Sequence, residues 1–259
     1  MMISILPLTS APEGMAVAEW EARLELAATY RLFATLGWGE MVFNHISLRL
    51  PGEPATYLMN PFGLMYEEVT ASNLIKVDLD GNLAEESLYA ANPAGFLFHG
   101  AIHRTVPDAH CVMHTHTTAG SAVACLDTGL SPDNFYAAQL YGTVAYHEFE
   151  GITVNAGEVP RMLAALGDKR LLVLRNHGLL SHGRTVAEAF YRLWVLNRAC
   201  EIQLQAQSTG QPLRQVSVAA AISSSRAAAD FLEPGEGPEQ LMFDALLRKV
   251  HRVDPGYAQ

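Results

Sequence analysis

The sequence predicts an α/β domain, because segments with helical apolar spacing alternate along the chain with short apolar segments typical of strands. The length of 259 residues fits one domain followed by a tail, since a single α/β domain can reach about 250 residues. Apolar side chains make up 49% of the chain, which is enough for a large core.

The first expected helix covers Ala16–Leu36. Val17, Trp20 and Leu24 recur at the spacing of one helical face, and charged residues lie between them. Gly37 follows the last apolar position and is typical of a residue that ends a helix.

Short apolar or alternating segments follow this helix. They are Ile46–Leu50, Thr56–Met59 and Leu74–Asp78, and Asp80-Gly81 supplies a turn of the hairpin type. We expect these segments to form a small sheet.

The middle of the chain alternates between expected helices and expected strands. The helices are Ala94–Thr105, Ala119–Leu126 and Glu158–Leu166, and the strands are His110–His114, Thr143–His147 and Leu171–Leu174. A longer helix opens with the capping-box pattern of Thr185 and Glu188 and runs to about Ser208.

The composition changes after Pro212, where the chain becomes rich in Ala and Ser. We therefore expect a main domain over residues 16–210 and a C-terminal helical appendage over residues 211–259. The last helix, Glu239–Val253, carries an apolar stripe that predicts packing on its own domain or on a neighbouring subunit. The stripe consists of Leu241, Phe243, Leu246, Leu247 and Val250.

The net charge excludes several classes of partner. The chain has 27 acidic and 17 basic residues and a net charge of −10, which disfavours nucleic acid and anionic membranes as partners.

The cysteines and the N-terminal segment indicate the compartment. The three cysteines are odd in number and lie in apolar runs, as buried free thiols of a reducing compartment do; they are Cys111, Cys125 and Cys200. Met1–Leu8 lacks a basic segment and contains Pro7, so we expect neither a signal peptide nor a membrane span. These features predict a cytoplasmic protein.

Three histidines indicate a metal site. His114 and His116 are two residues apart on an expected strand, so their imidazoles project to one face, and His177 follows a second apolar strand. A shared cation would relieve the repulsion between neighbouring imidazoles. The alternative is that each histidine is a hydrogen-bonded core or loop residue, and spacing alone leaves both interpretations open.

An ordered series of motifs resembles the class II aldolase and adducin head-domain family, most closely its adducin-like branch. The motifs are Asn92-Pro93-Ala94-Gly95-Phe96, His99, Arg104-x-x-Pro107-Asp108, His114-Thr115-His116, Tyr146-x-x-Phe149-x-Gly151, Arg175-Asn176-His177-Gly178 and Thr185-x-x-Glu188-Ala189-Phe190. The resemblance covers Trp20–Ser208. It implies a three-layer α/β/α fold with a central, mainly antiparallel sheet, and homotetramers whose active sites lie near subunit boundaries.

The resemblance also implies a function for the three histidines. In the sugar-phosphate aldolases of the family, zinc or a similar divalent ion held by three histidines polarises the substrate's oxygens. His114, His116 and His177 match these ligands, with zinc as the expected ion and iron or manganese as alternatives.

The family's acid/base residue does not carry over. In the aldolases, an acidic residue that moves protons follows two serines that hold the substrate's phosphate. The matching position here is Gly95, and the two serines are Pro93 and Ala94.

Two loops that bind phosphate in the family also differ. The Gly-Asn loop appears as Asn44-His45, and the Thr/Ser-Gly turn appears as Phe62-Gly63. A phosphate dianion needs several N–H and O–H donors. We therefore expect Asn44, Phe62, Gly63 and Gly95 to surround a small substrate that is neutral or carries a carboxylate, rather than a sugar phosphate.

Tyr136 and His45 are the candidates for the missing proton chemistry. Tyr136 falls near a tyrosine that the aldolases contribute across a subunit interface, although it can equally be a loop tyrosine packed at an interface. His45 can hydrogen-bond a metal-bound ligand. We expect His99 in the core or behind a ligand and His103 on the surface. The remaining histidines are expected to be solvated or capping, and they are His110, His147, His182 and His251.

Two classes of function compete. The first is a divalent-metal lyase that performs aldol cleavage or decarboxylation on a small substrate, with a non-haem iron oxygenase as a further alternative. The second is a non-catalytic module for oligomerisation and protein contacts, as the adducin head is usually regarded. Retention of all three histidines favours the enzyme.

Overall fold

The structure is a computed structural model that describes residues 9–52, 55–231 and 237–259. Its strands are β1 (His45–Arg49), β2 (Thr56–Met59), β3 (Ile75–Asp78), β4 (Cys111–Thr115), β5 (Val144–His147), β6 (Leu171–Leu174) and β7 (Gly178–Gly183). Within the described residues these strands form one sheet in the order β3-β2-β1-β4-β7-β6-β5. Neighbouring strands run antiparallel except β5 and β6, which run parallel. The predicted mainly antiparallel sheet is confirmed.

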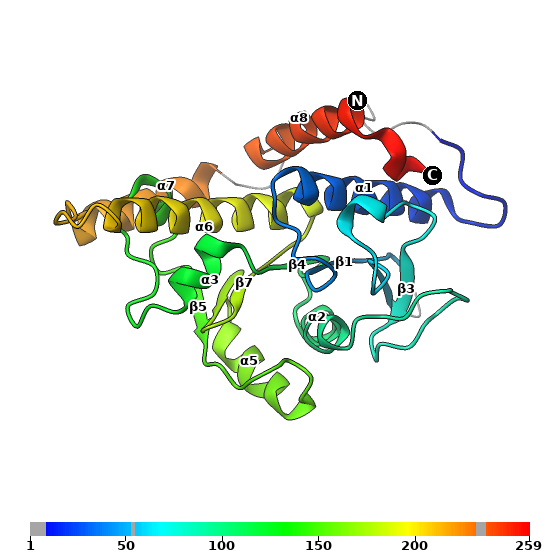
Figure 1. Cartoon of the computed structure of the whole chain (residues 1–259), viewed down its shortest axis with the longest axis horizontal. Coiled ribbons are helices and arrows are strands. Elements are labelled where there is room, and N and C mark those ends of the chain that lie inside the picture. The colour runs from blue at the N-terminus through cyan, green and yellow to red at the C-terminus, as the bar shows by residue number, and fades with distance from the viewer. Residues whose placement is uncertain (1–8, 53–54, 232–236) are drawn as a thin grey trace.

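Helices cover both faces of this sheet (Figure 1). They are α1 (Val17–Thr35), α2 (Pro93–Thr105), α3 (Thr118–Ala124), α4 (Phe135–Gln139), α5 (Val159–Leu166), α6 (Val186–Gln207), α7 (Val218–Phe231) and α8 (Pro238–Val253). Short 3-10 helices are η1 (Tyr66–Glu68), η2 (Ala156–Glu158) and η3 (Pro255–Ala258). Side chains of α1, α6 and α8 form one core against the sheet, and those of α2 and α5 form a second core on the opposite face. The three-layer α/β/α architecture follows.

Alternation along the strands decides which residues face which layer. In β4, Cys111 and Met113 belong to the core beneath α1 and α6, whereas Val112 belongs to the core beneath α2 and α5. His114 is two residues beyond Val112, so its side chain projects to the α2 side of the sheet. The same alternation in β1 places His45 and Ser47 on this side.

The expected helices and strands are confirmed, with ends that differ by two residues at most. The sequence did not predict β7, α4 or α7. β7 has no β-branched residue, although it lies in the middle of the sheet and is buried along its whole length. α4 is only five residues long, and α7 lies in the Ala- and Ser-rich segment.

The C-terminal residues pack on the rest of the chain. Phe243, Leu247 and Val250 of α8 are buried in the core that α1 and α6 share, whereas Leu241 on the same helix is exposed. Beyond α8, the Asp254 carboxylate accepts a hydrogen bond from Arg31 of α1 at 2.6 Å. The boundary between residues 210 and 211 stays a prediction.

The cysteines are free thiols. Cys111 and Cys200 are buried, as predicted, but Cys125 is exposed, so the prediction of a core position for it is wrong. Cys125 is the C-cap of α3, where the chain leaves the core. The prediction for Met1–Leu8 lies outside the described residues. None of the described helices combines the length and the apolar character needed to cross a membrane.

Candidate metal centre

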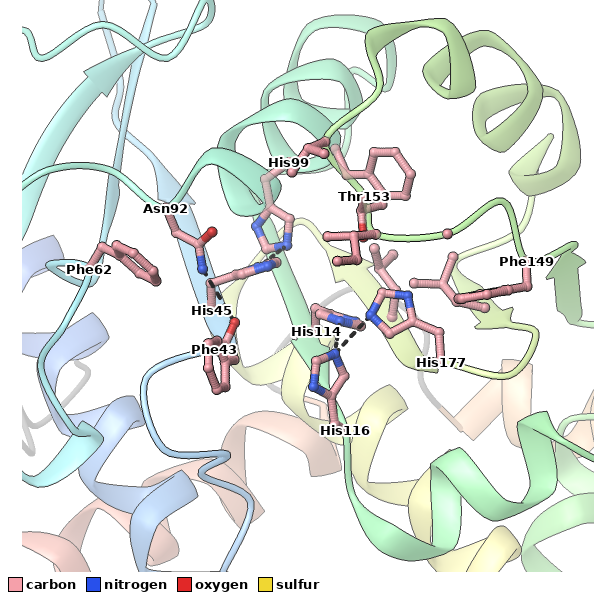
Figure 2. Close-up of a pocket in the computed structure, with 16 residues that line it drawn as sticks. Phe43, His45, Phe62, Asn92, His99, His114, His116, Phe149, Thr153 and His177 are labelled. Carbon is pink, nitrogen blue, oxygen red and sulfur yellow. Dashed lines mark hydrogen bonds between the residues drawn. The ribbon is translucent and has the colours of Figure 1, made fainter.

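The three predicted histidines converge on one point. The Nε2 atom of His116 lies 2.8 Å from Nε2 of His114 and 2.8 Å from Nε2 of His177 (Figure 2). One ligand atom from each of the three residues lies within 4.8 Å of those from the other two. His114 is buried, and His116 and His177 are half-buried.

The local backbone explains how His177 reaches the other two. Asn176 has a φ of 56°, in the left-handed region that Asn tolerates better than most residues, and this turns the chain sharply after β6. Gly178 follows at the start of β7. A Cβ atom there would lie 2.4 Å from the Thr115 carbonyl oxygen and 3.0 Å from Cδ2 of His116. Glycine therefore permits the close approach of β7 to the strand that carries His114.

A backbone hydrogen bond orients the His114 ring. Its Nδ1 atom lies 2.9 Å from the carbonyl oxygen of Leu179, which can only accept, so Nδ1 carries the proton. In the neutral ring, Nε2 then presents its lone pair to the other two imidazoles. Histidines that bind metals are commonly oriented by such a bond to a carbonyl group.

Burial keeps the three imidazoles neutral. It lowers the pKa of His114 well below the usual 6.5, and the neighbouring His177 and His116 lower this pKa further. Burial, followed by the neighbouring His116, lowers the pKa of His177 to about 4. Burial lowers the pKa of His116 as well. One proton on Nε2 of His116 can serve only one of its two nitrogen neighbours, whereas one cation would satisfy all three, so the donor set fits a divalent metal ion.

The cluster lies in a cavity of about 450 Å³. Aromatic and aliphatic side chains form most of its wall, and Phe43, Phe62 and Phe149 stand at its edge (Figure 2). The other lining residues are His45, Asn92, Phe98, His99, His114, His116, Gly151, Ile152, Thr153, Val154, Leu174, His177 and Leu180. The cavity thus combines three convergent nitrogens with a largely apolar wall.

Comparison with known proteins assigns the chain to a family. Residues 24–204 match the family model described as the Class II Aldolase and Adducin N-terminal domain. The chain belongs to the class II aldolase and adducin family.

The similar proteins in this family include both aldolases and adducins. A Pseudomonas aeruginosa protein provisionally named a class 2 aldolase is 42% identical over 247 residues, which cover 95% of each chain. Rat alpha-adducin is 45% identical over 194 residues, which cover 73% of this chain but 26% of alpha-adducin. The solved structure of L-fuculose 1-phosphate aldolase from Glaciozyma antarctica PI12 matches with a TM-score of 0.81 and 26% identity, over 96% of this chain and 97% of that one.

Two of the non-metal residues predicted for the site line the cavity, namely His45 and Phe62. Asn44 and Gly63 do not, and the Asn44 amide donates instead to the Trp38 carbonyl oxygen at 2.9 Å. The side chains of Pro93 and Ala94 lie outside the part of the chain that the structure describes.

Gly95, which we predicted to replace an acidic residue of the aldolases, lies beside an imidazole ring. A Cβ atom at this position would lie 3.0 Å from Cδ2 of His45 and 2.9 Å from the terminal methyl carbon of Met59. Gly95 is buried and is not among the residues that line the cavity. The space that a side chain would need at residue 95 is therefore occupied by the ring of His45 and the terminal methyl group of Met59.

Tyr136 lies away from the cavity of this chain. It belongs to α4, and its ring packs against Trp194 of α6 with the ring centroids 5.5 Å apart. Tyr136 could therefore contribute only to the cavity of a second copy of the chain. Its catalytic role stays a prediction.

Three other histidines are not where the sequence predicted. His103, expected on the surface, is fully buried, because it faces β1 and its Nδ1 donates to the Ala109 carbonyl oxygen at 2.7 Å. His147 and His182, expected in solvent or as caps, are also buried. His147 lies 3.0 Å from the buried Glu158 carboxylate, and His182 bonds to the Lys169 carbonyl oxygen at 3.1 Å.

Four polar residues that extend from the cavity wall into the interior were not predicted as a group from the sequence. His45 and Ser47 are two apart on a strand, and His99 and His103 are four apart on a helix, so each pair shares one face. The combination of these two spacings was the available signal. The structure brings the two faces together.

Proposed function

We propose that the chain is a divalent-metal-dependent lyase that breaks a carbon–carbon bond in a small hydroxylated carbonyl or carboxylate compound, by aldol cleavage or decarboxylation. The convergence of the Nε2 atoms of His114, His116 and His177 in a cavity carries the proposal. Family membership and the likeness to a fuculose phosphate aldolase support lyase chemistry.

His114, His116 and His177 would hold the metal ion. When bound, a divalent ion supplies Lewis acidity that stabilises negative charge on a substrate oxygen. Three imidazoles with room for a further ligand suit zinc best, with iron or manganese as alternatives.

The cavity wall favours a substrate without phosphate. Among the described residues that line it there is no lysine, arginine or serine. A phosphate dianion would find few donors there. Phe43, Phe62 and Phe149 instead offer apolar contact to a small carbon skeleton.

His45 would act as the proton acceptor. In aldol cleavage, the proton of the substrate's hydroxyl group passes to His45, the carbon that carried the hydroxyl becomes a carbonyl, and the electron pair of the broken carbon–carbon bond stays on the other fragment. Tyr136 of a neighbouring subunit would complete the site in the predicted homotetramer. A cytoplasmic location stays a prediction as well.

A second function is favoured by the 45% identity to rat alpha-adducin over 194 residues. It is a non-catalytic module for oligomerisation and protein contacts. A non-haem iron oxygenase is the third possibility that the three histidines allow.

Turnover of metal-loaded protein distinguishes these functions. We expect cleavage or decarboxylation of non-phosphorylated hydroxy ketones or hydroxy acids, with a loss of at least about 100-fold in His116→Ala because the Lewis acid is removed. His110→Ala, at an exposed position, is the control. Comparable turnover of fuculose 1-phosphate or ribulose 5-phosphate would contradict the proposed substrate class. Metal-loaded protein without any turnover would favour the adducin-like module, and bound iron with oxygen consumption would favour the oxygenase.

A further inference from the structure

A continuous chain of hydrogen bonds runs from a backbone carbonyl to the cavity. The Ala109 oxygen lies 2.7 Å from Nδ1 of His103, whose Nε2 lies 2.7 Å from the Ser47 hydroxyl. The hydroxyl lies 2.7 Å from Nδ1 of His99, whose Nε2 lies 3.0 Å from Nδ1 of His45. All four side chains are buried, and Figure 2 shows the contact between His45 and His99.

Each bond in this chain fixes the direction of the next. A carbonyl oxygen can only accept, so Nδ1 of His103 carries the proton, and Nε2 of the neutral ring accepts from Ser47. Since the Ser47 hydrogen points to His103, its oxygen accepts from Nδ1 of His99. Nε2 of His99 then has no proton and accepts from Nδ1 of His45. His45 is left with a lone pair on Nε2.

The inner part of this hydrogen-bond chain lies away from solvent, since His99 and His103 are fully buried. Burial is the main cause that lowers the pKa of His103 to about 4. Burial also lowers the pKa of His99 well below its usual value. Ser47, which links these two residues, is itself fully buried, so bulk water does not reach this link.

The last residue of this hydrogen-bond chain, His45, lies at the candidate site. Nε2 of His45 has no hydrogen-bond partner among the described residues, and His45 lines the cavity. Its ring centroid lies 5.2 Å from that of His114, one of the three histidines proposed to bind the metal ion. Gly95 leaves the space that this ring fills.

We propose that this chain of hydrogen bonds locks His45 in the tautomer with its proton on Nδ1, so that the site presents a fixed acceptor, Nε2, beside the metal ligands. The ligand class that fits is a compound with a hydroxyl group next to the oxygen that binds the metal. A carbonyl, carboxylate or phosphate oxygen at this point would face a lone pair and bind poorly. The tautomer is a property of the protein alone, whereas the ligand class rests on the proposed function.

The tautomer can be read by nitrogen NMR of protein with 15N-labelled histidine, in which the His45→Gln variant assigns the His45 signals. We expect Nδ1 of His45 to be protonated and Nε2 unprotonated, with or without zinc. A proton on Nε2 of His45 would overturn the proposal. Absence of metal binding would instead contradict the proposed function. The tautomer of His45 could still be measured in the metal-free protein.

Variants of two buried serines separate the hydrogen-bond chain from general packing. Ser47→Ala removes the link between His99 and His103, so we expect a mixture of both tautomers at His45. Ser181→Ala is the matched control, because Ser181 is equally buried but donates to the Ala189 carbonyl oxygen. If His45 kept a single, unchanged tautomer in folded Ser47→Ala protein, the hydrogen-bond chain would not be what sets that tautomer.

Glycolate and methoxyacetate test the ligand class, since only glycolate has a hydroxyl donor. With saturating ligand on the zinc-loaded protein, we expect glycolate to shift the Nε2 signal of His45 and methoxyacetate to leave it in place. Equal shifts, or none with either ligand, would overturn the assignment of the ligand class.

Discussion

Asn176 and Gly178 flank His177 and bring it to the end of β4, where the other two histidines of the cluster lie. The sequence predicted the three ligands from their spacing and from a resemblance, but not the reason for the residues on either side of His177. That reason is a backbone with a φ of 56° at Asn176 and a near contact between Gly178 and the Thr115 carbonyl. Such contacts arise between segments far apart in sequence, so one sequence does not reveal them.

Gly178→Ala tests this account at the residue scale. The added methyl group would lie 2.4 Å from a backbone oxygen that cannot rotate away, so β7 must move. We expect a loss of about 1–3 kcal/mol in the free energy of unfolding, together with weaker metal binding. Gly39→Ala is the control, since its nearest neighbour would be 3.9 Å away. Equal stability and metal content in both variants, measured by urea unfolding and elemental analysis, would contradict the account.

At the scale of elements, the periodic helices and strands were predictable, whereas the contacts between their faces were not. His103 was expected on the surface because helical spacing alone does not reveal which side of α2 meets the sheet. It is buried against β1, where its Nε2 contacts the Ser47 hydroxyl. The hydrogen-bond chain that leads to His45 depends on this contact. The phase of a helix relative to a sheet is fixed only by packing.

Helix α8 gives a prediction about core packing. Phe243 is fully buried between α8 and the layer formed by α1 and α6, so Phe243→Ala should lower the free energy of unfolding by about 3–5 kcal/mol. Leu241→Ala, on the same helix but 64% exposed, should change it little. A small effect of Phe243→Ala in chemical unfolding would show that residues 211–259 are separate from the main core.

Buried histidines on α2 and β7 predict a loss of stability in acid. The pKa of His103 and of His182 falls to about 4 in the folded chain, chiefly through burial, against 6.5 as the usual value. The unfolded chain therefore binds protons that the folded chain excludes as the pH falls from about 6.5 to about 4. Each group should reduce the free energy of unfolding by up to about 1.4 kcal/mol per pH unit in this window.

The measurement is urea unfolding of the metal-free protein across that window. His182→Leu should give a shallower dependence on pH, because one buried titrating group is removed. His110→Gln, at an exposed position, should leave the slope unchanged. Stability that rises as the pH falls below about 6 would have the wrong sign for this explanation.

At the scale of the whole molecule, exposed apolar side chains surround the cavity. Phe43, Phe149 and Ile152 are 53%, 56% and 82% exposed, and Tyr136 lies away from the cavity of its own chain. Both features are expected if a second copy completes the site, and one chain alone does not reveal such a contact.

Light scattering tests the predicted assembly. We expect the mass of four chains of 28.2 kDa each at micromolar concentration. The mass of one chain would contradict the homotetramer, and with it any catalytic role for Tyr136 from a neighbouring subunit.

Elemental analysis of protein purified without an affinity tag tests the central claim that His114, His116 and His177 hold a divalent metal ion. We predict about one divalent ion per chain, and loss of most of it in the double variant His114→Ala, His116→Ala, because a single remaining imidazole binds too weakly. His110→Ala should keep its metal. Full occupancy in a folded double variant would contradict the account.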